Sequence, residues 1–382
     1  MPDDPFFKNV PFPNEEATGK WDHGGMSFSD GREDSSLLDA STTVNPFGPP
    51  FSIQETIARA SRGFDRYPDP WGENILSILS DCLSVSAEHL VVGPGSTALL
   101  YRWVEAVRPA RLVLFEPIFS EYRKAAFLYG IPCETISASV PIPFKGDLCP
   151  DPRQYWGIDL SAPLSLRSGD YLVLVNPVNP TGQEFSRECL LDLWKKVSAS
   201  GAGLLLDESF QDFLENRSSL LPEIGEGNEK LSILRSLTKV TGLPGIRTGW
   251  LAGGPNLVSS LRLRLGPWAI GALEEAVIFH WARSAGEAKI LFRRVRAARE
   301  ELSALLVRQG VPVAEGESPF LFVFTGWGPD AYRRKESIFH RFGVYLRVAE
   351  GFGPDSGMDY IRLGFGAFQN PGKIVTLLTE LS

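Results

Sequence analysis

The fold is decided by the stretch Leu231-Ser-Ile-Leu-Arg-Ser-Leu-Thr-Lys-Val-Thr-Gly-Leu-Pro-Gly-Ile-Arg-Thr-Gly249. It starts as a largely apolar run, typical of a strand buried on both faces of a parallel sheet, and continues as a turn rich in Gly and Pro. Lys239 lies just past the strand and eight residues before Arg247. A lysine in this setting can present its amine as a nucleophile beside a bound phosphate. Solvated loop lysines are more common, but they do not explain the spacing of Ser236, Lys239 and Arg247.

Similar apolar runs precede this stretch and alternate with segments of helical composition. The runs are His89–Val92, Arg111–Phe115, Tyr171–Val175 and Gly203–Leu206. The helical segments are Ser96–Val107, Ser120–Tyr129 and Ser186–Ser200, and each opens with Ser, a preferred N-cap residue. This alternation predicts an α/β architecture with a mostly parallel sheet sandwiched by helices.

The pattern changes after about residue 266. A long helix is predicted over Ala285–Gln309, and short strands follow at Phe320–Phe324, Tyr345–Arg347 and Tyr360–Gly364. These elements are typical of a smaller α+β domain. The beginning of the chain is rich in Pro, Gly, Asp and Ser and has little periodicity. We therefore expect an N-terminal arm over residues 1–50, a large domain over 51–265 and a small C-terminal domain over 266–382.

Charge and composition exclude several classes of protein. The chain has 382 residues, 46 acidic and 38 basic, and its net charge of −8 argues against a protein that binds nucleic acid or a membrane surface. Neither a signal peptide nor a membrane span is recognisable, so we expect a cytoplasmic protein. Cys82, Cys133, Cys149 and Cys189 lack the spacing of metal ligands, and we predict no metal site.

The segment Gly93-Pro-Gly-Ser-Thr-Ala98 has two interpretations. It follows a predicted strand, opens a helix and precedes Glu116 by about 20 residues, as in a dinucleotide-binding fingerprint. The physical requirement is broader, because a Gly-rich turn at a helix N-terminus presents N–H groups to any phosphate. A plain strand-to-helix turn is the alternative.

Two further segments follow predicted strands directly. They are Asn176-Pro-Val-Asn-Pro-Thr-Gly182 and Asp207-Glu-Ser-Phe210. In isolation, the first reads as a Pro-rich turn and the second as a helix cap. Ligands of open α/β sheets bind beyond the carboxyl ends of the strands, so we expect these loops, the Gly93 turn and Lys239 to converge on one crevice.

Taken together, these motifs resemble the pyridoxal-phosphate-dependent aminotransferase family of fold type I, classes I and II. The resemblance rests on Ser236-x-x-Lys239 with Arg247, Asn179-Pro-Thr-Gly182, Asp207, and Arg362 within Tyr-Ile-Arg-Leu-Gly-Phe-Gly. It implies pyridoxal 5'-phosphate as the cofactor and removes the reason for a nicotinamide, because hydride transfer needs no such lysine.

The resemblance also implies a role for each matching residue. Lys239 would bond covalently to the cofactor, and Asp207 would pair with its protonated pyridine nitrogen. Asn179 would donate to the ring O3′, Phe119 would stack on the ring, and Arg362 would grip the substrate carboxylate. The phosphate cradle would comprise Gly95, Ser96, Ser236 and Arg247.

A narrower likeness is to threonine-phosphate decarboxylases of cobalamin biosynthesis and their relatives, the histidinol-phosphate aminotransferases. It is carried by His23-Gly-Gly25, Asn45-Pro-Phe-Gly48, Arg66-Tyr-Pro-Asp69, Glu116-Pro-Ile-Phe-Ser-Glu-Tyr122, Arg235-Ser-Leu-Thr-Lys239 and Gly266-Pro-Trp268. It implies that His23 and Arg347 help bind a substrate phosphate and that Tyr67 reaches the cofactor phosphate of a partner subunit. A homodimer is therefore expected.

Some positions depart from the family pattern. Phe210 stands where many aminotransferases have a tyrosine, Pro94 replaces an asparagine, and Val348-Ala349 replaces Asp-Cys after Arg347. The leading prediction is decarboxylation of L-threonine O-phosphate, a small phosphorylated amino acid. An aminotransferase that acts on histidinol phosphate or another amino acid would use the same residues and is the main alternative. A regulator's cofactor-binding module is a third, although the chain has no basic helix-turn-helix segment.

Overall fold

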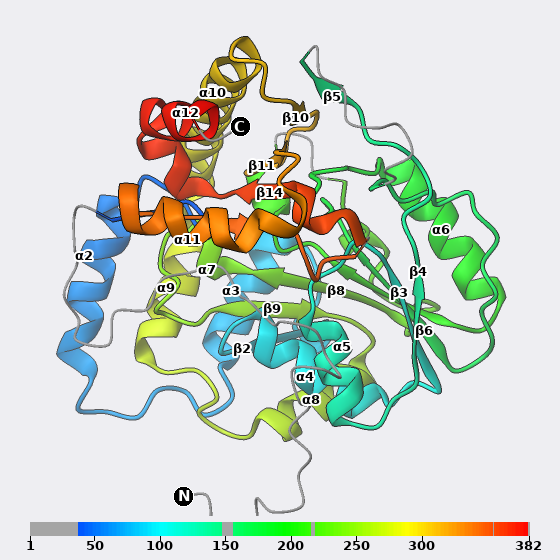
Figure 1. Ribbon diagram of the computed structural model, residues 1–382. Helices are drawn as coiled ribbons and strands as arrows, with labels where there is room; N and C mark the ends of the chain where they lie inside the picture. The colour runs from blue at the N-terminus through cyan, green and yellow to red at the C-terminus, as the bar shows by residue number, and fades with distance from the viewer. Residues whose placement is uncertain (1–36, 147–155, 215–217, 354, 381–382) are drawn as a thin grey trace, which may run out of the picture.

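A seven-stranded sheet lies at the centre of the molecule in a computed structural model that describes residues 37–146, 156–214, 218–353 and 355–380 (Figure 1). In spatial order its strands are β2 (Leu90–Gly93), β9 (Gly249–Ala252), β8 (Leu231–Ser236), β7 (Gly203–Asp207), β6 (Asp170–Val175), β3 (Arg111–Phe115) and β4 (Cys133–Ile136). Strands β4, β3, β6, β7 and β8 pair in parallel, whereas β9 runs antiparallel to both β8 and β2. The mostly parallel sheet predicted from the apolar runs is confirmed.

Helices cover both faces of this sheet. One face packs on α4 (Ser96–Val107), α5 (Glu121–Leu128) and α8 (Pro255–Leu265), and the other on α3 (Glu73–Leu83), α6 (Arg187–Ala199) and α9 (Ala272–Arg283). Alternate residues of β3 show why its sequence is apolar throughout. Leu112 and Leu114 belong to the first core, whereas Val113 and Phe115 belong to the second.

The predicted helices are present, but their predicted caps differ. Ser186 caps α6, since its hydroxyl accepts a hydrogen bond from the Cys189 N–H at 3.3 Å. Gly95 takes the N-cap position of α4, so Ser96 is the first residue of that helix. The Ser96 side chain lines a pocket instead of capping the helix.

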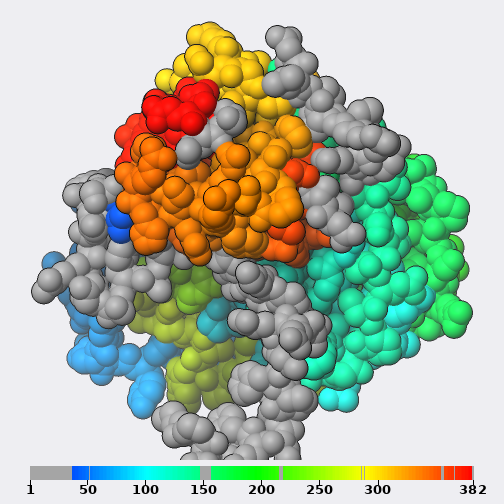
Figure 2. Space-filling model, in the orientation of Figure 1, coloured from blue at the N-terminus to red at the C-terminus, as the bar shows by residue number. Residues whose placement is uncertain are grey.

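A smaller sheet lies beside the first one. Its order is β13 (Arg347–Val348), β14 (Tyr360–Leu363), β11 (Leu321–Phe324), β10 (Val313–Ala314) and β5 (Phe144–Lys145). Its core includes residues of α10 (Ala285–Arg308), α11 (Ala331–Phe342) and α12 (Pro371–Glu380). Figure 2 shows the C-terminal elements of this part, from α10 to α12 and coloured yellow to red, gathered at the top of the molecule.

Several strands differ from the prediction made above, and β4 and β10 were not predicted. The single strand expected at Tyr345–Arg347 is two strands, because β12 (Val344–Tyr345) pairs with β1 (Leu38–Asp39), whereas β13 pairs with β14. Strand β9 was missed because Gly249 continues a Gly-rich loop. Strand β5 comes from the middle of the chain and joins the small sheet. The domain boundary near residue 265 stays a prediction.

Two short helices complete the order of elements relevant to the site. Helix α2 (Phe51–Ala60) packs near α9, and α7 (Leu237–Val240) is a single turn directly after β8. Across the residues described above, no helix has the length and apolar character needed to cross a membrane.

Candidate active site

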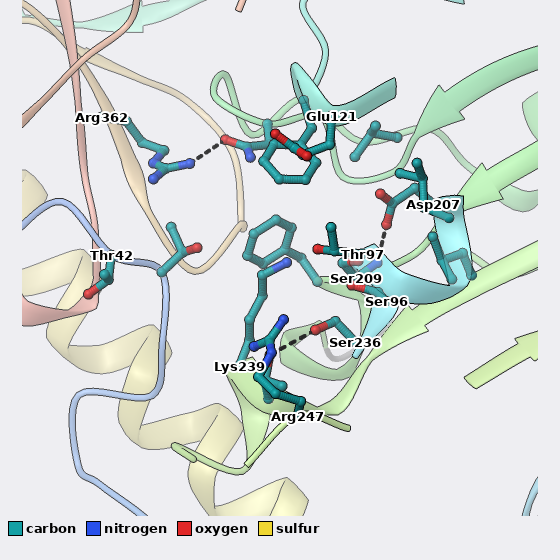
Figure 3. Close-up of a pocket in the computed structure, with 18 residues that line it drawn as sticks. Thr42, Ser96, Thr97, Glu121, Asp207, Ser209, Ser236, Lys239, Arg247 and Arg362 are labelled. Atoms are coloured by element: carbon teal, nitrogen blue, oxygen red, sulfur yellow. Dashed lines mark hydrogen bonds between the residues drawn. The ribbon is translucent and has the colours of Figure 1, made fainter. Parts of the chain in front are cut away.

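A cavity of about 400 Å³ opens at the carboxyl ends of β6, β7 and β8, where the two sheets meet. Figure 3 shows Lys239, Ser236 and Arg247 on one side of it, Asp207 on a second side and Arg362 opposite. Of the predicted site residues, the cavity is lined by Ser96, Phe119, Asn179, Asp207, Ser236, Lys239, Arg247 and Arg362. The expected convergence of the loops is therefore present.

Lys239 lies in the α7 turn with its amine directed into the cavity (Figure 3). Burial lowers the pKa of its amine to about 8, and the positive charges of Arg362 and Arg247 act in the same direction, while Asp207 opposes them. The Nζ atom lies 4.3 Å from the centre of the Phe210 ring. A lysine with this pKa has a substantial neutral, nucleophilic fraction near neutral pH.

The predicted phosphate cradle is formed by close backbone approaches. A Cβ atom at Gly95 would lie 2.8 Å from Nη2 of Arg247, and a Cβ at Gly249 would lie 2.7 Å from the backbone N of Ser96. Gly95 also has a φ of +88°, which favours glycine. The hydroxyls of Ser236 and Thr238 are 3.0 Å apart beside this turn. The arrangement sets a helix N-terminus, hydroxyls and a guanidinium around one place, as an anion requires.

Asp207 ends β7 and is only 6% exposed. Its Oδ1 accepts a hydrogen bond from the Ser209 N–H at 3.0 Å, and its Oδ2 accepts one from the Tyr122 hydroxyl at 2.8 Å. Such hydrogen bonds offset the cost of burying a polar side chain.

Behind Asp207, a buried ion network ties β8 to the loop after β7. Arg235 contacts Glu208 at 2.6 Å and Asp212 at 3.0 Å, and Ser219 donates to Glu208. Because Glu208 directly follows Asp207 and Arg235 directly precedes Ser236, this network fixes the strand ends that carry the site.

Arg362 and Asn179 meet on the opposite wall. Nη1 of Arg362 donates to Asn179 Oδ1 at 2.8 Å, and Nη2 donates to the Ser41 carbonyl at 2.7 Å. Among the described residues, the buried Nε finds no hydrogen-bond partner. Burial and the neighbouring Arg347 lower the pKa of Arg362 to about 9. Two cations therefore lie close together in a site that attracts anions.

Arg347 is paired in register with Arg362 across β13 and β14. It is 6% exposed, and its guanidinium lies 5.1 Å from the ring centre of Phe352, while that of Arg362 lies 5.5 Å from the same ring. Arg347 thus lies beside Arg362, although it is not among the residues that line the cavity.

Two other predicted residues lie elsewhere. Tyr67 is 85% exposed and packs against Trp268, with 5.2 Å between the ring centres. His23 is outside the described residues. Glu116, which the dinucleotide interpretation required, forms an ion pair with Arg123.

Sequence reasoning missed several lining residues. They are Thr42, Thr43, Thr97, Leu100, Glu121, Val175, Ser209, Leu234 and Thr238. Thr97 and Thr238 lie within the quoted motifs and could have been found there. Thr42 and Thr43 gave no signal, because they belong to a segment that reaches the site only through pairing with the small domain's β12.

No group of three or more His, Cys, Asp or Glu side chains within these ranges is placed to hold a metal ion. The cavity instead offers the buried amine of Lys239, the carboxylate of Asp207, and two places that attract anions, at Arg247 and Arg362. This set suits an organic cofactor with a phosphate group.

The sequence is similar to those of known proteins. The family model for aminotransferases of class I and II matches residues 42–380. A relative in Caldanaerobacter subterraneus, provisionally named threonine-phosphate decarboxylase, is 30% identical over 239 residues, which are 62% of this chain and 61% of that protein. The chain thus spans about three fifths of that relative's length. A histidinol-phosphate aminotransferase of Chlorobium phaeovibrioides is 29% identical, and the match covers 81% of both chains.

The fold is also that of solved structures. The L-threonine-O-3-phosphate decarboxylase of Porphyromonas gingivalis superimposes with a TM-score of 0.73 at 21% identity, over 89% of this chain and 97% of that one. The predicted fold type I architecture is confirmed.

Proposed function

Because the chain belongs to the class I and II aminotransferase family, we propose that it decarboxylates L-threonine O-3-phosphate to (R)-1-aminopropan-2-yl phosphate and carbon dioxide. The cofactor is pyridoxal 5'-phosphate, as in the family. The proposal includes a place in cobalamin biosynthesis, in line with the names of relatives.

The described residues fit this cofactor. A Cβ at Gly95 would collide with the Arg247 guanidinium, so glycine lets the turn and this cation approach each other closely, as a phosphate cradle requires. We propose that Gly95, Ser96, Ser236 and Arg247 hold the phosphate, and that Phe119 covers the ring. Asp207 would meet the pyridine nitrogen and Asn179 the ring O3′. When bound, the cofactor accepts the electrons released at the substrate Cα.

The observation that carries the substrate proposal is the pair of buried arginines on neighbouring strands. A plain amino acid brings one carboxylate to this wall, whereas a phosphorylated amino acid brings two anionic ends. Arg362 and Arg347 are adjacent in register, and both are buried. Two neighbouring cations attract the two anionic ends of a phosphorylated amino acid, which favours a doubly anionic substrate. We assign the carboxylate to Arg362 and the phosphate to Arg347 with His23.

The orientation of the bound substrate then selects the bond that breaks. Arg362 would hold the carboxylate, and we propose that the phosphate anchors turn it perpendicular to the cofactor ring, where it is the group that leaves as carbon dioxide. Lys239, whose amine has a pKa of about 8, can return the proton to Cα. Phe210 gives the ring no hydroxyl at the position where many aminotransferases have a tyrosine.

We further propose a cytoplasmic homodimer. Its support is Tyr67, which is 85% exposed beside Trp268 in the single chain, and which the family resemblance places near the cofactor phosphate of a partner.

The second candidate is an aminotransferase that acts on histidinol phosphate or another amino acid, with 2-oxoglutarate as the acceptor. It is favoured by the 29% identity to the Chlorobium enzyme, whose match covers more of the chain. The same lysine and arginines would serve it. The two candidates differ in whether the Cα–H bond or the carboxylate bond is broken.

One experiment separates them. The cofactor-loaded protein is incubated with L-threonine O-phosphate and 2-oxoglutarate, and the products are identified by mass spectrometry. Aminopropanol phosphate without glutamate supports the decarboxylase, and glutamate supports the aminotransferase. L-histidinol phosphate and L-serine O-phosphate serve as parallel substrates. Absence of any product from all three would overturn both candidates.

A further inference from the structure

We propose that Tyr122 is a positioning residue that orients the Asp207 carboxylate toward the cofactor ring. This inference rests on the cofactor role proposed for Asp207 above. It concerns a residue that lies behind the cavity wall and does not line the cavity.

The contact is a single buried hydrogen bond between residues 85 positions apart. The Tyr122 ring belongs to the core between α4, α5 and the large sheet, and the residue is fully buried. Its hydroxyl meets Asp207 Oδ2 at 2.8 Å, while Ser209 N–H meets Oδ1 at 3.0 Å. Because each oxygen accepts a hydrogen bond, the carboxylate cannot rotate freely. The direction of its remaining lone pairs is therefore fixed as well.

The hydroxyl is the donor in this bond. Burial and then the charge of Asp207 raise the pKa of Tyr122 well above its ordinary value, so the phenol keeps its proton. Both of these donors to Asp207 are therefore neutral. Neutral donors orient a carboxylate but leave its negative charge, which a protonated pyridine nitrogen can then share. An arginine at the same place would compensate that charge within the protein.

The first turn of α5 links this contact to a second one. The Tyr122 N–H donates to the Phe119 carbonyl at 3.3 Å, and Phe119 lines the cavity. One turn of chain thus carries two groups of the proposed cofactor site. The Phe119 ring would cover the cofactor face, and the Tyr122 hydroxyl orients the Asp207 carboxylate at the edge of the cofactor ring. A shift of α5 would disturb both.

The test is Tyr122→Phe, which removes the hydroxyl and keeps the buried ring. We expect the dissociation constant of pyridoxal phosphate from the protein to rise about tenfold or more, as for loss of a hydrogen bond to a charged group. We also expect the visible absorbance of the bound cofactor to change its pH dependence, and kcat to fall more than KM rises. Tyr171→Phe is the matched control, because Tyr171 packs on Trp103 in the same core and does not line the cavity. It should leave cofactor binding unchanged.

A double-mutant cycle with Asp207→Asn separates positioning from packing. If Tyr122 acts through Asp207, Tyr122→Phe changes the cofactor dissociation constant less than about twofold when the Asp207→Asn change is already present. An equal loss in both backgrounds, or no loss in the parent, would overturn the inference while Asp207 keeps its role. If Asp207→Asn alone changes neither affinity nor spectrum, the proposed role of Asp207 fails and the inference fails with it.

Discussion

The two walls of the cavity are built in different ways. The wall with Lys239, Ser236, Arg247 and Gly95 comes from strand ends of one sheet, and its contacts join neighbouring loops. The wall with Arg362 joins Asn179 and Ser41, which are 183 and 321 residues away in sequence. The residues of the first wall lie in recognisable motifs, although Gly95 and Arg247 are distant in sequence, whereas Ser41 on the second wall lies in no such motif. We propose that the first wall serves the cofactor and that the second serves the substrate, with Asn179 contributing to both, and the predictions below test that division.

The largest effect is expected on the cofactor wall from Lys239→Ala. Without the amine, no covalent bond to the cofactor forms, and turnover should fall to background because the nucleophile is gone. Absorbance spectra of the dialysed protein and product assays measure both. Lys195→Ala, in an exposed ion pair with Asp192, is the control and should behave as the parent. Turnover by the Lys239 variant at the parent rate would remove lysine from the mechanism.

Gly364→Ala should disrupt the substrate wall while it leaves every polar side chain of that wall in place. The added Cβ would overlap the carbonyl oxygen of Thr42, so the segment that supplies Ser41 and Thr42 must move. Overpacking of this kind costs about 1–3 kcal/mol or more. We expect a lower thermal midpoint and a raised KM.

The cofactor affinity of the Gly364→Ala variant tests the division between the two walls, because the cofactor wall is built from other segments of the chain. Gly372→Ala, where a Cβ meets nothing within 4 Å, is the control. A Gly364→Ala protein with parental KM and stability would show that the segment adapts freely, against the division into walls.

Arg362→Ala should have a narrower effect, which falls on substrate binding and leaves the fold in place. Loss of a charge-assisted hydrogen bond costs roughly 1.5–3 kcal/mol, seen as weaker substrate binding. Cofactor affinity should not change. Arg333→Ala, an exposed residue paired with Asp330, is the control. Unchanged substrate affinity in the Arg362 variant would place the substrate carboxylate elsewhere.

The smallest effect is the pH dependence of cofactor uptake by the cofactor-free protein. Uptake needs the neutral amine, and burial lowers the pKa of Lys239 from 10.5 to about 8. The uptake rate should therefore rise with pH, by about fivefold between pH 7 and 8, and level off above about pH 9. Stopped-flow absorbance measures it. A rate that continues to rise about tenfold per unit beyond about pH 9 would indicate an ordinary exposed lysine.

The contrast between the walls explains what the sequence could predict. The strands of the large sheet were recognisable because their residues face apolar cores on both sides, as Leu112 and Val113 do. Lys239, Asp207 and Arg247 were recognisable because local turns bring them to the strand ends. The family resemblance added Arg362, Asn179 and Phe119 to the candidates.

Contacts between distant segments carried no local signal. Nothing around Thr42 indicates that it lines a cavity, because its place depends on the pairing of β1 with β12. Tyr122 reads as an ordinary core residue, because only the tertiary structure brings Asp207 to its hydroxyl. A single strand was predicted at Tyr345–Arg347, because the chain passes from one sheet to the other at Leu346 without an interruption of the apolar pattern.

The bond between Arg362 and the Ser41 carbonyl has a consequence for biosynthesis. Ser41 leaves the ribosome 321 residues before its partner, a delay of roughly 15 to 60 s at ordinary rates of translation. The residues of the cofactor wall, whose last element ends at Ala252, have all been synthesised while Arg362 and β12 have not. A nascent chain could therefore capture cofactor before it can select a substrate.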